Sequence, residues 1–192
     1  MIDPSPFNLI LNSLYFILPA YFANMCPIIF KWIPFGGKPV NEGLFGSHKT
    51  WRGFYVGYIG ALIILALQFY LQKKGLTIPI NPDNFAFYSK NNAGTLLDYE
   101  QINIFFYAFL FGIGAITGDT LKSFFKRRLK IAPGQPWFPF DQLDFIVGAL
   151  VFLSPFYITP WKNTLVILII TPLLHFLANA TAYLLRLKKV WW

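Results

Sequence analysis

Five apolar segments, separated by short stretches that collect most of the charges, set the strongest limit on how this chain can fold. A helix that crosses the hydrocarbon core of a membrane needs about 20 mostly apolar residues, and the segments approach that length. We therefore expect an all-α integral membrane protein, a bundle of about five transmembrane helices that forms a single domain over residues 1–192. The predicted spans cover about residues 7–30, 54–71, 102–117, 145–158 and 164–185.

The composition excludes several other classes of protein. The chain is 56% hydrophobic, 20% aromatic and 12% charged, whereas soluble domains carry about a quarter charged residues and disordered chains are polar and poor in aromatics. The single cysteine, Cys26, excludes a disulfide framework and zinc sites that need two cysteines from one chain. A net charge of +8 suits nucleic acid, anionic lipid or a phosphorylated substrate. The apolar bulk argues against nucleic acid as the partner.

The basic residues predict the orientation of the chain. Twelve of the 16 lysines and arginines follow the first, third or fifth predicted span, which places them on one side of the membrane. The positive-inside rule assigns this side to the cytoplasm, so the N-terminus is expected outside and the C-terminus inside. We therefore expect a multi-pass protein of the plasma membrane with two functional cytoplasmic loops. The N-terminus lacks the basic region of a signal peptide, so the first span is expected to be retained.

The second cytoplasmic loop, residues 118–145, holds a regular pattern of charged side chains. If the third helix continues to about Lys130, four polar residues at spacing i, i+3, i+4 and i+7 share one face. The helix that opens at Asp141 and Asp144 presents two further carboxylates at its N-terminus, where the helix dipole favours negative charge. Its apolar run of 14 residues spans only about 21 Å, so either the bilayer thins there or the aspartates lie in a polar cavity. The residues on the face of the third helix are Asp119, Lys122, Ser123 and Lys126.

Three carboxylates beside several basic residues are typical of a site for Mg²⁺ and phosphate. Mg²⁺ prefers oxygen ligands and takes one or two carboxylates together with substrate phosphates, and lysine and arginine bind the remaining phosphate charge. The alternative is a basic helix that only fixes the topology, with the aspartates as caps and ion-pair partners. The predicted metal ligands are Asp119, Asp141 and Asp144.

The first cytoplasmic loop adds a second basic motif. Its glycines provide flexible backbone whose N–H groups could approach phosphates, although the spacing matches no Walker A loop. Lys49 and Arg52, three residues apart, begin the second span. They are candidates for binding phosphate, and the alternative is that they only anchor the helix at the membrane interface.

Taken together, these motifs resemble those of the CDP-archaeol synthase family, which belongs with the CDP-diacylglycerol synthases. The resemblance covers roughly residues 19–150. It rests on GSHKTWRG at residues 46–53, on GDTLKSFFKRR followed by PG, DQLDF and GA within residues 118–149, and on PAYFANMCPIIF at residues 19–30. The His-Gly-Gly run that precedes the paired aspartates in the diacylglycerol enzymes is missing, which favours the archaeal branch.

The resemblance implies an enzyme that transfers CMP from CTP to a lipid phosphate and releases pyrophosphate, for phospholipid synthesis. It implies Mg²⁺ as cofactor, held by the three aspartates, with Lys126 beside them in catalysis. The lipid phosphate is already mostly ionised near pH 7, so positioning and charge neutralisation suffice. The residues expected to bind the phosphates of CTP and lipid or to support these sites are Lys49, Arg52, Ser123, Lys126 and Arg127.

Two other functions remain open from the residues alone. A CTP-dependent lipid or polyprenol kinase would use similar aspartates and basic residues but would release CDP. A small membrane transporter would show repeated halves with broken helices, and no repeat is visible here. The hydrophobic effect buries isoprenoid ether chains and acyl ester chains alike, because it has no directional preference. Both types of lipid substrate therefore stay open. The oligomeric state is also open.

Overall fold

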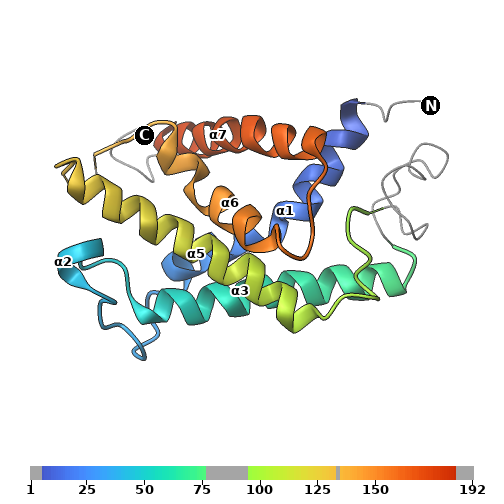
Figure 1. Ribbon diagram of the computed structural model, residues 1–192, viewed down its shortest axis with the longest axis horizontal. Coiled ribbons are helices and arrows are strands. Elements are labelled where there is room, and N and C mark those ends of the chain that lie inside the picture. Colours follow the sequence, from blue (N-terminus) through green and yellow to red (C-terminus); the bar gives the residue numbers. More distant parts are fainter. Residues whose placement is uncertain (1–5, 77–94, 133–134, 185–192) are drawn as a thin grey trace.

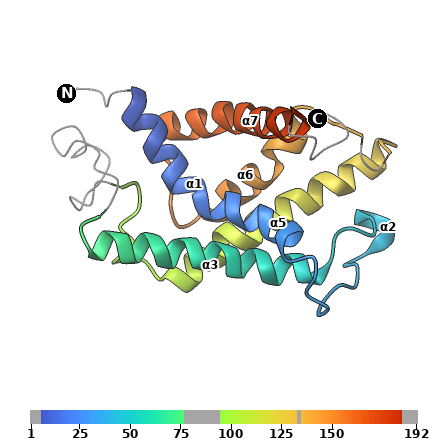
Figure 2. The same ribbon diagram turned by 180° about the vertical axis from the view of Figure 1, so that it is seen from behind.

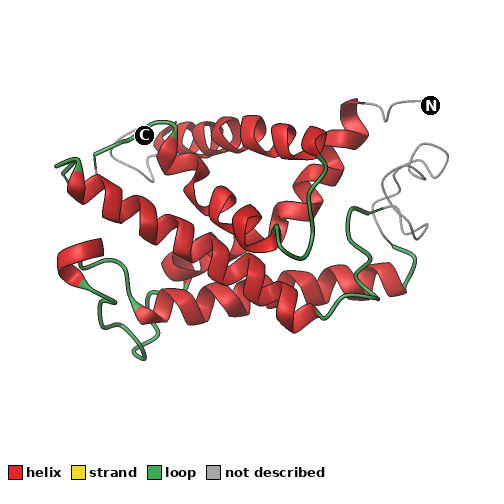
Figure 3. Cartoon of the chain, viewed as in Figure 1, coloured by secondary structure: helices red, strands yellow, loops and turns green. Residues whose placement is uncertain are grey.

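The computed structural model describes residues 6–76, 95–132 and 135–184, and this part of the chain folds into helices joined by loops, with no strand among the described residues (Figures 1 and 3). The helices are α1 (Pro6–Ile29), α2 (Glu42–Phe45), α3 (Trp51–Lys73), α5 (Ile104–Arg128), α6 (Phe140–Leu153) and α7 (Trp161–Leu184). The predicted all-α architecture is therefore confirmed.

Four of these helices are long and apolar enough to cross a membrane, and they cover Pro6–Ile29, Trp51–Lys73, Ile104–Arg128 and Trp161–Thr181. They agree with four of the five predicted spans and make the chain a multi-pass membrane protein. The fourth predicted span, 145–158, overlaps the 14-residue helix α6, which begins at Phe140 and ends at Leu153, so only residues 145–153 of this span are helical. The number of crossings and the orientation of the termini stay predictions. The basic residues at 186–189 and residues 77–94, between the second and third predicted spans, lie outside the described residues.

Helix α5 is longer than the predicted third span, because it continues through the charged motif. Asn103 caps its N-terminus by accepting a hydrogen bond from the Phe106 N–H at 3.1 Å. The helix has no proline, and it ends where Lys130 adopts the left-handed backbone conformation, with φ 57°. The four polar residues predicted to share one face therefore do stand on a continuous helix.

Helices α5 and α6 approach closely through glycines, and this contact places the start of α6 beside the charged face of α5 (Figure 1). A Cβ atom added to Gly118 would collide with the carbonyl oxygen of Asp144, and one added to Gly148 would collide with that of Gly114. Small residues at a helix interface allow the backbones to approach in this way. The glycines thus bring Asp144 directly against α5.

Seen from behind, α1 crosses between α3 and α7 (Figure 2), and it packs against both, as well as against α5 and α6. Pro19 lies inside α1 and has no N–H, so the carbonyl of Tyr15 loses its donor within the helix. The buried side chain of Gln68 in α3 replaces it, because its Nε2 donates to the Tyr15 oxygen at 2.6 Å. An interhelical hydrogen bond therefore repairs the break in α1, as membrane helices with proline require.

This arrangement predicts that Gln68 and Pro19 are energetically coupled. Replacing Gln68 with leucine leaves the Tyr15 carbonyl unsatisfied and should lower the free energy of unfolding by about 1–3 kcal/mol. The same replacement should cost much less in a Pro19→Ala background, because an alanine at this position supplies the helical N–H donor. Thermal unfolding of the four proteins in detergent gives the coupling energy of the cycle. Equal costs in both backgrounds would show that the hydrogen bond does not serve this purpose.

Candidate active site

A polar cavity of about 640 Å³ opens between the first basic loop, α5, and the start of α6. It is lined mainly by charged and polar side chains from segments far apart in the sequence, with a few apolar residues from α1, α3 and α5. Among the lining residues are Asn24, Lys31, His48, Lys49, Arg52, Asp119, Lys122, Asp141, Asp144 and His175.

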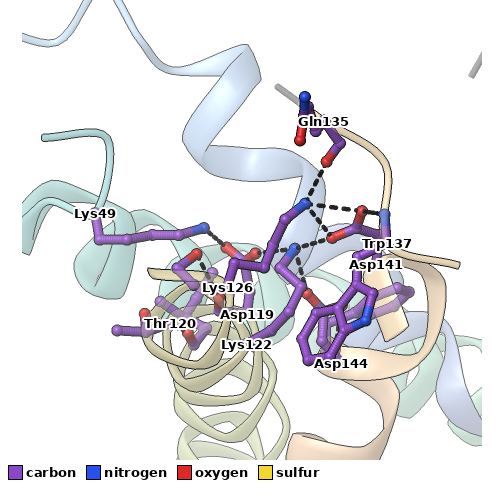
Figure 4. Close-up of polar contacts among 12 residues, drawn as sticks. Lys49, Asp119, Thr120, Lys122, Lys126, Gln135, Trp137, Asp141 and Asp144 are labelled. Atoms are coloured by element: carbon purple, nitrogen blue, oxygen red, sulfur yellow. Dashed lines mark hydrogen bonds and ion pairs between the residues drawn. The ribbon is translucent and has the colours of Figure 1, made fainter. Parts of the chain in front are cut away.

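The centre of the site is one lysine surrounded by three carboxylates (Figure 4). The ammonium nitrogen of Lys122 lies 3.0 Å from Asp119 Oδ1, 3.3 Å from Asp141 Oδ1 and 2.6 Å from Asp144 Oδ2. Helix α5 supplies Asp119 and Lys122 one turn apart, and the first turns of α6 supply the other two aspartates. The structure thus brings together the three residues predicted as metal ligands.

Two further lysines complete a cluster whose charges balance. Lys49, from the first basic loop, forms an ion pair with Asp119. Lys126 donates hydrogen bonds to both carboxylate oxygens of Asp141 at 3.0 Å and to the Gln135 carbonyl at 2.6 Å. The backbone N–H of Trp137 also donates to Asp141 Oδ2 at 2.6 Å. These contacts fix Asp141 in place and join the 135–137 segment to α5 (Figure 4).

Asp144 is the carboxylate with the least compensation. Its side chain is 5% exposed, and its Oδ1 accepts a hydrogen bond from the Phe145 N–H at 2.6 Å. The buried Oδ2 lies within ion-pair distance of Lys122, but among the described residues no donor forms a well-directed hydrogen bond with it. Burial, with the negative charge of Asp119 added, raises the pKa of Asp144 to about 7 against the opposing effect of Lys122. An additional cation beside this oxygen would therefore be stabilised.

The first basic loop is held in shape by backbone contacts that aim its cations at the cavity. The Val40 N–H donates to the Lys49 carbonyl at 2.8 Å, and the Arg52 N–H donates to the Gly36 carbonyl at 2.7 Å. Gly36 has φ 70°, a conformation that glycine adopts readily. A Cβ atom at Gly36 would also lie 3.1 Å from the Arg52 nitrogen. The loop therefore depends on a glycine at this position.

The remaining predicted site residues lie near the cluster without joining it. The Arg52 guanidinium lines the cavity but donates to the Ile33 carbonyl at 2.5 Å. Ser123 is buried and donates back to the Asp119 carbonyl at 3.0 Å, within α5. Neither Ser123 nor Lys126 lines the cavity, and Arg127 is also outside the lining.

The cavity contains residues that the sequence did not assign to the site. Lys122 contacts all three aspartates, and its position on the same helix face as Asp119 was the available signal. His175, in α7, lines the cavity and its Nδ1 lies 3.1 Å from the Nδ2 of Asn179. No sequence signal links α7 to a cavity formed by the N-terminal loop, because that neighbourhood depends on the packing of the helices.

The donor chemistry fits Mg²⁺, although the aspartates do not form a ready cage. Carboxylate oxygens are the ligands that Mg²⁺ prefers, and Asp144 Oδ2 lacks a directed donor. Among the described residues, however, no three carboxylate, imidazole or thiolate groups stand close enough to hold a metal ion as they are. The Lys122 ammonium lies between the carboxylates instead.

The fold and the cavity define a multi-pass membrane protein with a charged site suited to phosphorylated ligands, and comparison with known proteins agrees. The family model for CDP-archaeol synthase matches residues 6–192. CDP-archaeol synthases of Methanocaldococcus jannaschii and Pyrococcus furiosus are 36% and 35% identical to the chain, cover 97% and 95% of it, and match over 99% and 98% of their own lengths.

A solved structure of an intramembrane enzyme for archaeal membrane lipid biosynthesis has the same fold. It superposes with a TM-score of 0.62 at 27% sequence identity, covering 88% of this chain and 94% of its own. The chain belongs to the CDP-archaeol synthase family, as its motifs predicted. It is therefore an enzyme of the cytidylyltransferase class, and the transporter and kinase interpretations are set aside.

Proposed function

We propose that this enzyme transfers CMP from CTP to the phosphate of an archaeal ether lipid, giving a CDP-activated lipid and pyrophosphate for phospholipid synthesis. Support comes from the names of its relatives, which are CDP-archaeol synthases, and from the neighbouring archaeal lipid enzyme. The observation that carries the proposal is the cluster of three aspartates and three lysines at the wall of a polar cavity.

The chemistry needs little acid–base catalysis. A lipid phosphate monoester is mostly dianionic near pH 7, so its oxygen attacks the α-phosphorus of CTP directly. The bond from that phosphorus to the β-phosphate oxygen breaks, and pyrophosphate leaves with the electron pair. The enzyme must therefore hold two anions in line and neutralise their repulsion.

The charged residues of the cavity suit these tasks. Asp119, Asp141 and Asp144 would hold Mg²⁺, which supplies charge neutralisation at the phosphates when bound. Lys49 and Arg52 lie on the cavity wall formed by the first basic loop and would bind phosphate oxygens. Lys126 would act on the site by fixing Asp141, while Ser123 supports the backbone and Arg127 adds positive potential at the end of α5.

An apolar hollow suited to the lipid chains lies beside the polar cavity. A second hollow of about 470 Å³ lies next to the cavity on α3 and α5, and it is lined only by aromatic and aliphatic side chains. Phe54 lines both hollows. A lipid chain in the apolar hollow would leave its phosphate near the charged cluster, at the cytoplasmic face of the plasma membrane in our proposal.

Turnover of CTP labelled at either the α- or the γ-phosphorus tests this proposal. With the full chain in lipid nanodiscs and Mg²⁺, we expect the α-label in the lipid product and the γ-label in pyrophosphate. An archaeal ether phosphatidic acid should have a higher kcat/KM than dioleoyl phosphatidic acid. Transfer of the γ-label to lipid would instead indicate a kinase. Equal use of both lipids would overturn the ether-lipid assignment while leaving cytidylyl transfer in place.

A further inference from the structure

Lys122 occupies the position that a cation ligated by the three aspartates would need. Its ammonium nitrogen contacts Asp119, Asp141 and Asp144 at 2.6–3.3 Å, and each aspartate contributes an oxygen to this contact (Figure 4). The other two lysines of the cluster, Lys49 and Lys126, each contact only one of the aspartates. Lys122 therefore differs from them, because it alone among the described cations joins all three.

The geometry leads us to infer that Lys122 is a resident counter-ion which a divalent cation displaces and which then pairs with a substrate phosphate. The inference rests on the proposed metal site and assigns a role to a residue that the proposed reaction leaves unused. Lys122 stabilises the aspartates before substrate binds, and its departure opens their oxygens to the metal. It is a positioning residue in the first state and a phosphate-binding residue in the second.

Electrostatics requires the displacement. Two positive ions a few ångströms apart repel by several kcal/mol even at an effective dielectric constant of about 20, so Mg²⁺ and the ammonium cannot share the three carboxylates. With all three aspartates ionised, the cluster without metal is neutral, since three lysines stand against three aspartates. Adding a divalent cation makes it positive by two charges. Moving one ammonium out to an anionic phosphate relieves this excess.

The side chain can move without disturbing the fold. Lys122 lines the cavity and is 16% exposed. Its four-carbon stem is flexible, and its charge can be hydrated or paired as it moves. Lys126, by contrast, is held by three hydrogen bonds to Asp141 and Gln135 and does not line the cavity. The displacement therefore concerns Lys122 and leaves Lys126 in place.

Binding of Mn²⁺ to the full chain in detergent, without CTP or lipid, tests the first half of the inference. Electron paramagnetic resonance reports the free ion, and the variant is Lys122→Met, which removes the charge and keeps much of the stem. The matched control is Lys130→Met, an exposed lysine after the same helix. We expect Lys122→Met to bind Mn²⁺ at least about tenfold more tightly than the control. Affinity equal to or weaker than that of the control would overturn the inference and leave the metal assignment standing. If neither the wild type nor either variant bound Mn²⁺, both the inference about Lys122 and the metal assignment would be overturned.

A measurement on the wild type removes any dependence on how the variant folds. Brief acetylation of lysine amines, read by peptide mass spectrometry, reports how accessible each ammonium group is. We expect Lys122 to be poorly labelled in EDTA, more strongly labelled with Mn²⁺, and protected again when CTP is added with Mn²⁺. Lys130 should be labelled to the same extent under all three conditions. If Mn²⁺ did not change the labelling of Lys122, displacement by the metal would be contradicted. If CTP did not protect Lys122, its pairing with a phosphate would be contradicted.

Discussion

Replacing Asp144 with asparagine is expected to lower kcat for CMP transfer about a hundredfold or more, the size of effect seen when one group that stabilises transition-state charge is removed. The side chain is buried, and its Oδ2 faces Lys122 without a directed hydrogen bond. Asparagine keeps the shape but removes the negative charge that would bind a divalent cation. The steady-state rate of pyrophosphate release at saturating CTP measures the effect.

The control for this variant is Glu42→Gln, which removes one negative charge from the first turn of α2, outside the lining of the cavity. Its rate should stay within about twofold of the wild type, since exposed charges contribute little. Thermal unfolding of Asp144→Asn should show a folded protein, because Lys122 keeps two aspartate partners. A folded Asp144→Asn enzyme that retains full activity would remove Asp144 from the proposed site.

Replacing Gly148 with alanine is expected to destabilise the protein and to disable the site together. The added Cβ would collide with the Gly114 carbonyl and would lie 2.8 Å from the Gly118 nitrogen and Cα, so the clash is with backbone. Overpacking of this kind costs about 1–3 kcal/mol. We therefore expect the Tm in detergent to fall by several degrees. Activity should fall as well, because the added methyl group pushes α6 away from α5 and so moves Asp144 away from Lys122.

Gly43→Ala is the matched control, since a Cβ atom there would meet only the Asn41 Oδ1 at an ordinary 3.6 Å. It should leave both Tm and activity close to those of the wild type. If Gly148→Ala behaved like this control, the close packing of α5 against α6 would not be needed to hold the aspartates.

The helical face on α5 illustrates what a sequence can reveal. Asp119, Lys122 and Lys126 recur at the spacing of one helix face, and the absence of proline before Leu129 lets that helix continue, so periodicity alone predicted their alignment. The start of α6 was harder to place. The sequence predicted that Asp141 and Asp144 open this helix and that its apolar span begins at residue 145, whereas the helix begins at Phe140.

The contacts across the cluster depend on packing that no local pattern encodes. The sequence predicted that Asp119, Asp141 and Asp144 would act together, but it did not show that Lys122 would lie between them, since that depends on the glycine contact of α5 with α6. Arg52, in the first turn of α3, likewise donates to the backbone carbonyl of Ile33 in the preceding loop. That contact follows from the turn at Gly36, which spacing alone does not predict.

The position of a divalent cation in crystals of the enzyme grown with Mn²⁺ and CTP tests the proposed site most directly. Anomalous scattering locates Mn²⁺ independently of the refined protein. We predict a peak at bonding distance from carboxylate oxygens of Asp119, Asp141 and Asp144, with the Lys122 ammonium moved onto a phosphate of CTP. A peak elsewhere in the cavity, with Lys122 still seated between the three aspartates, would contradict this prediction.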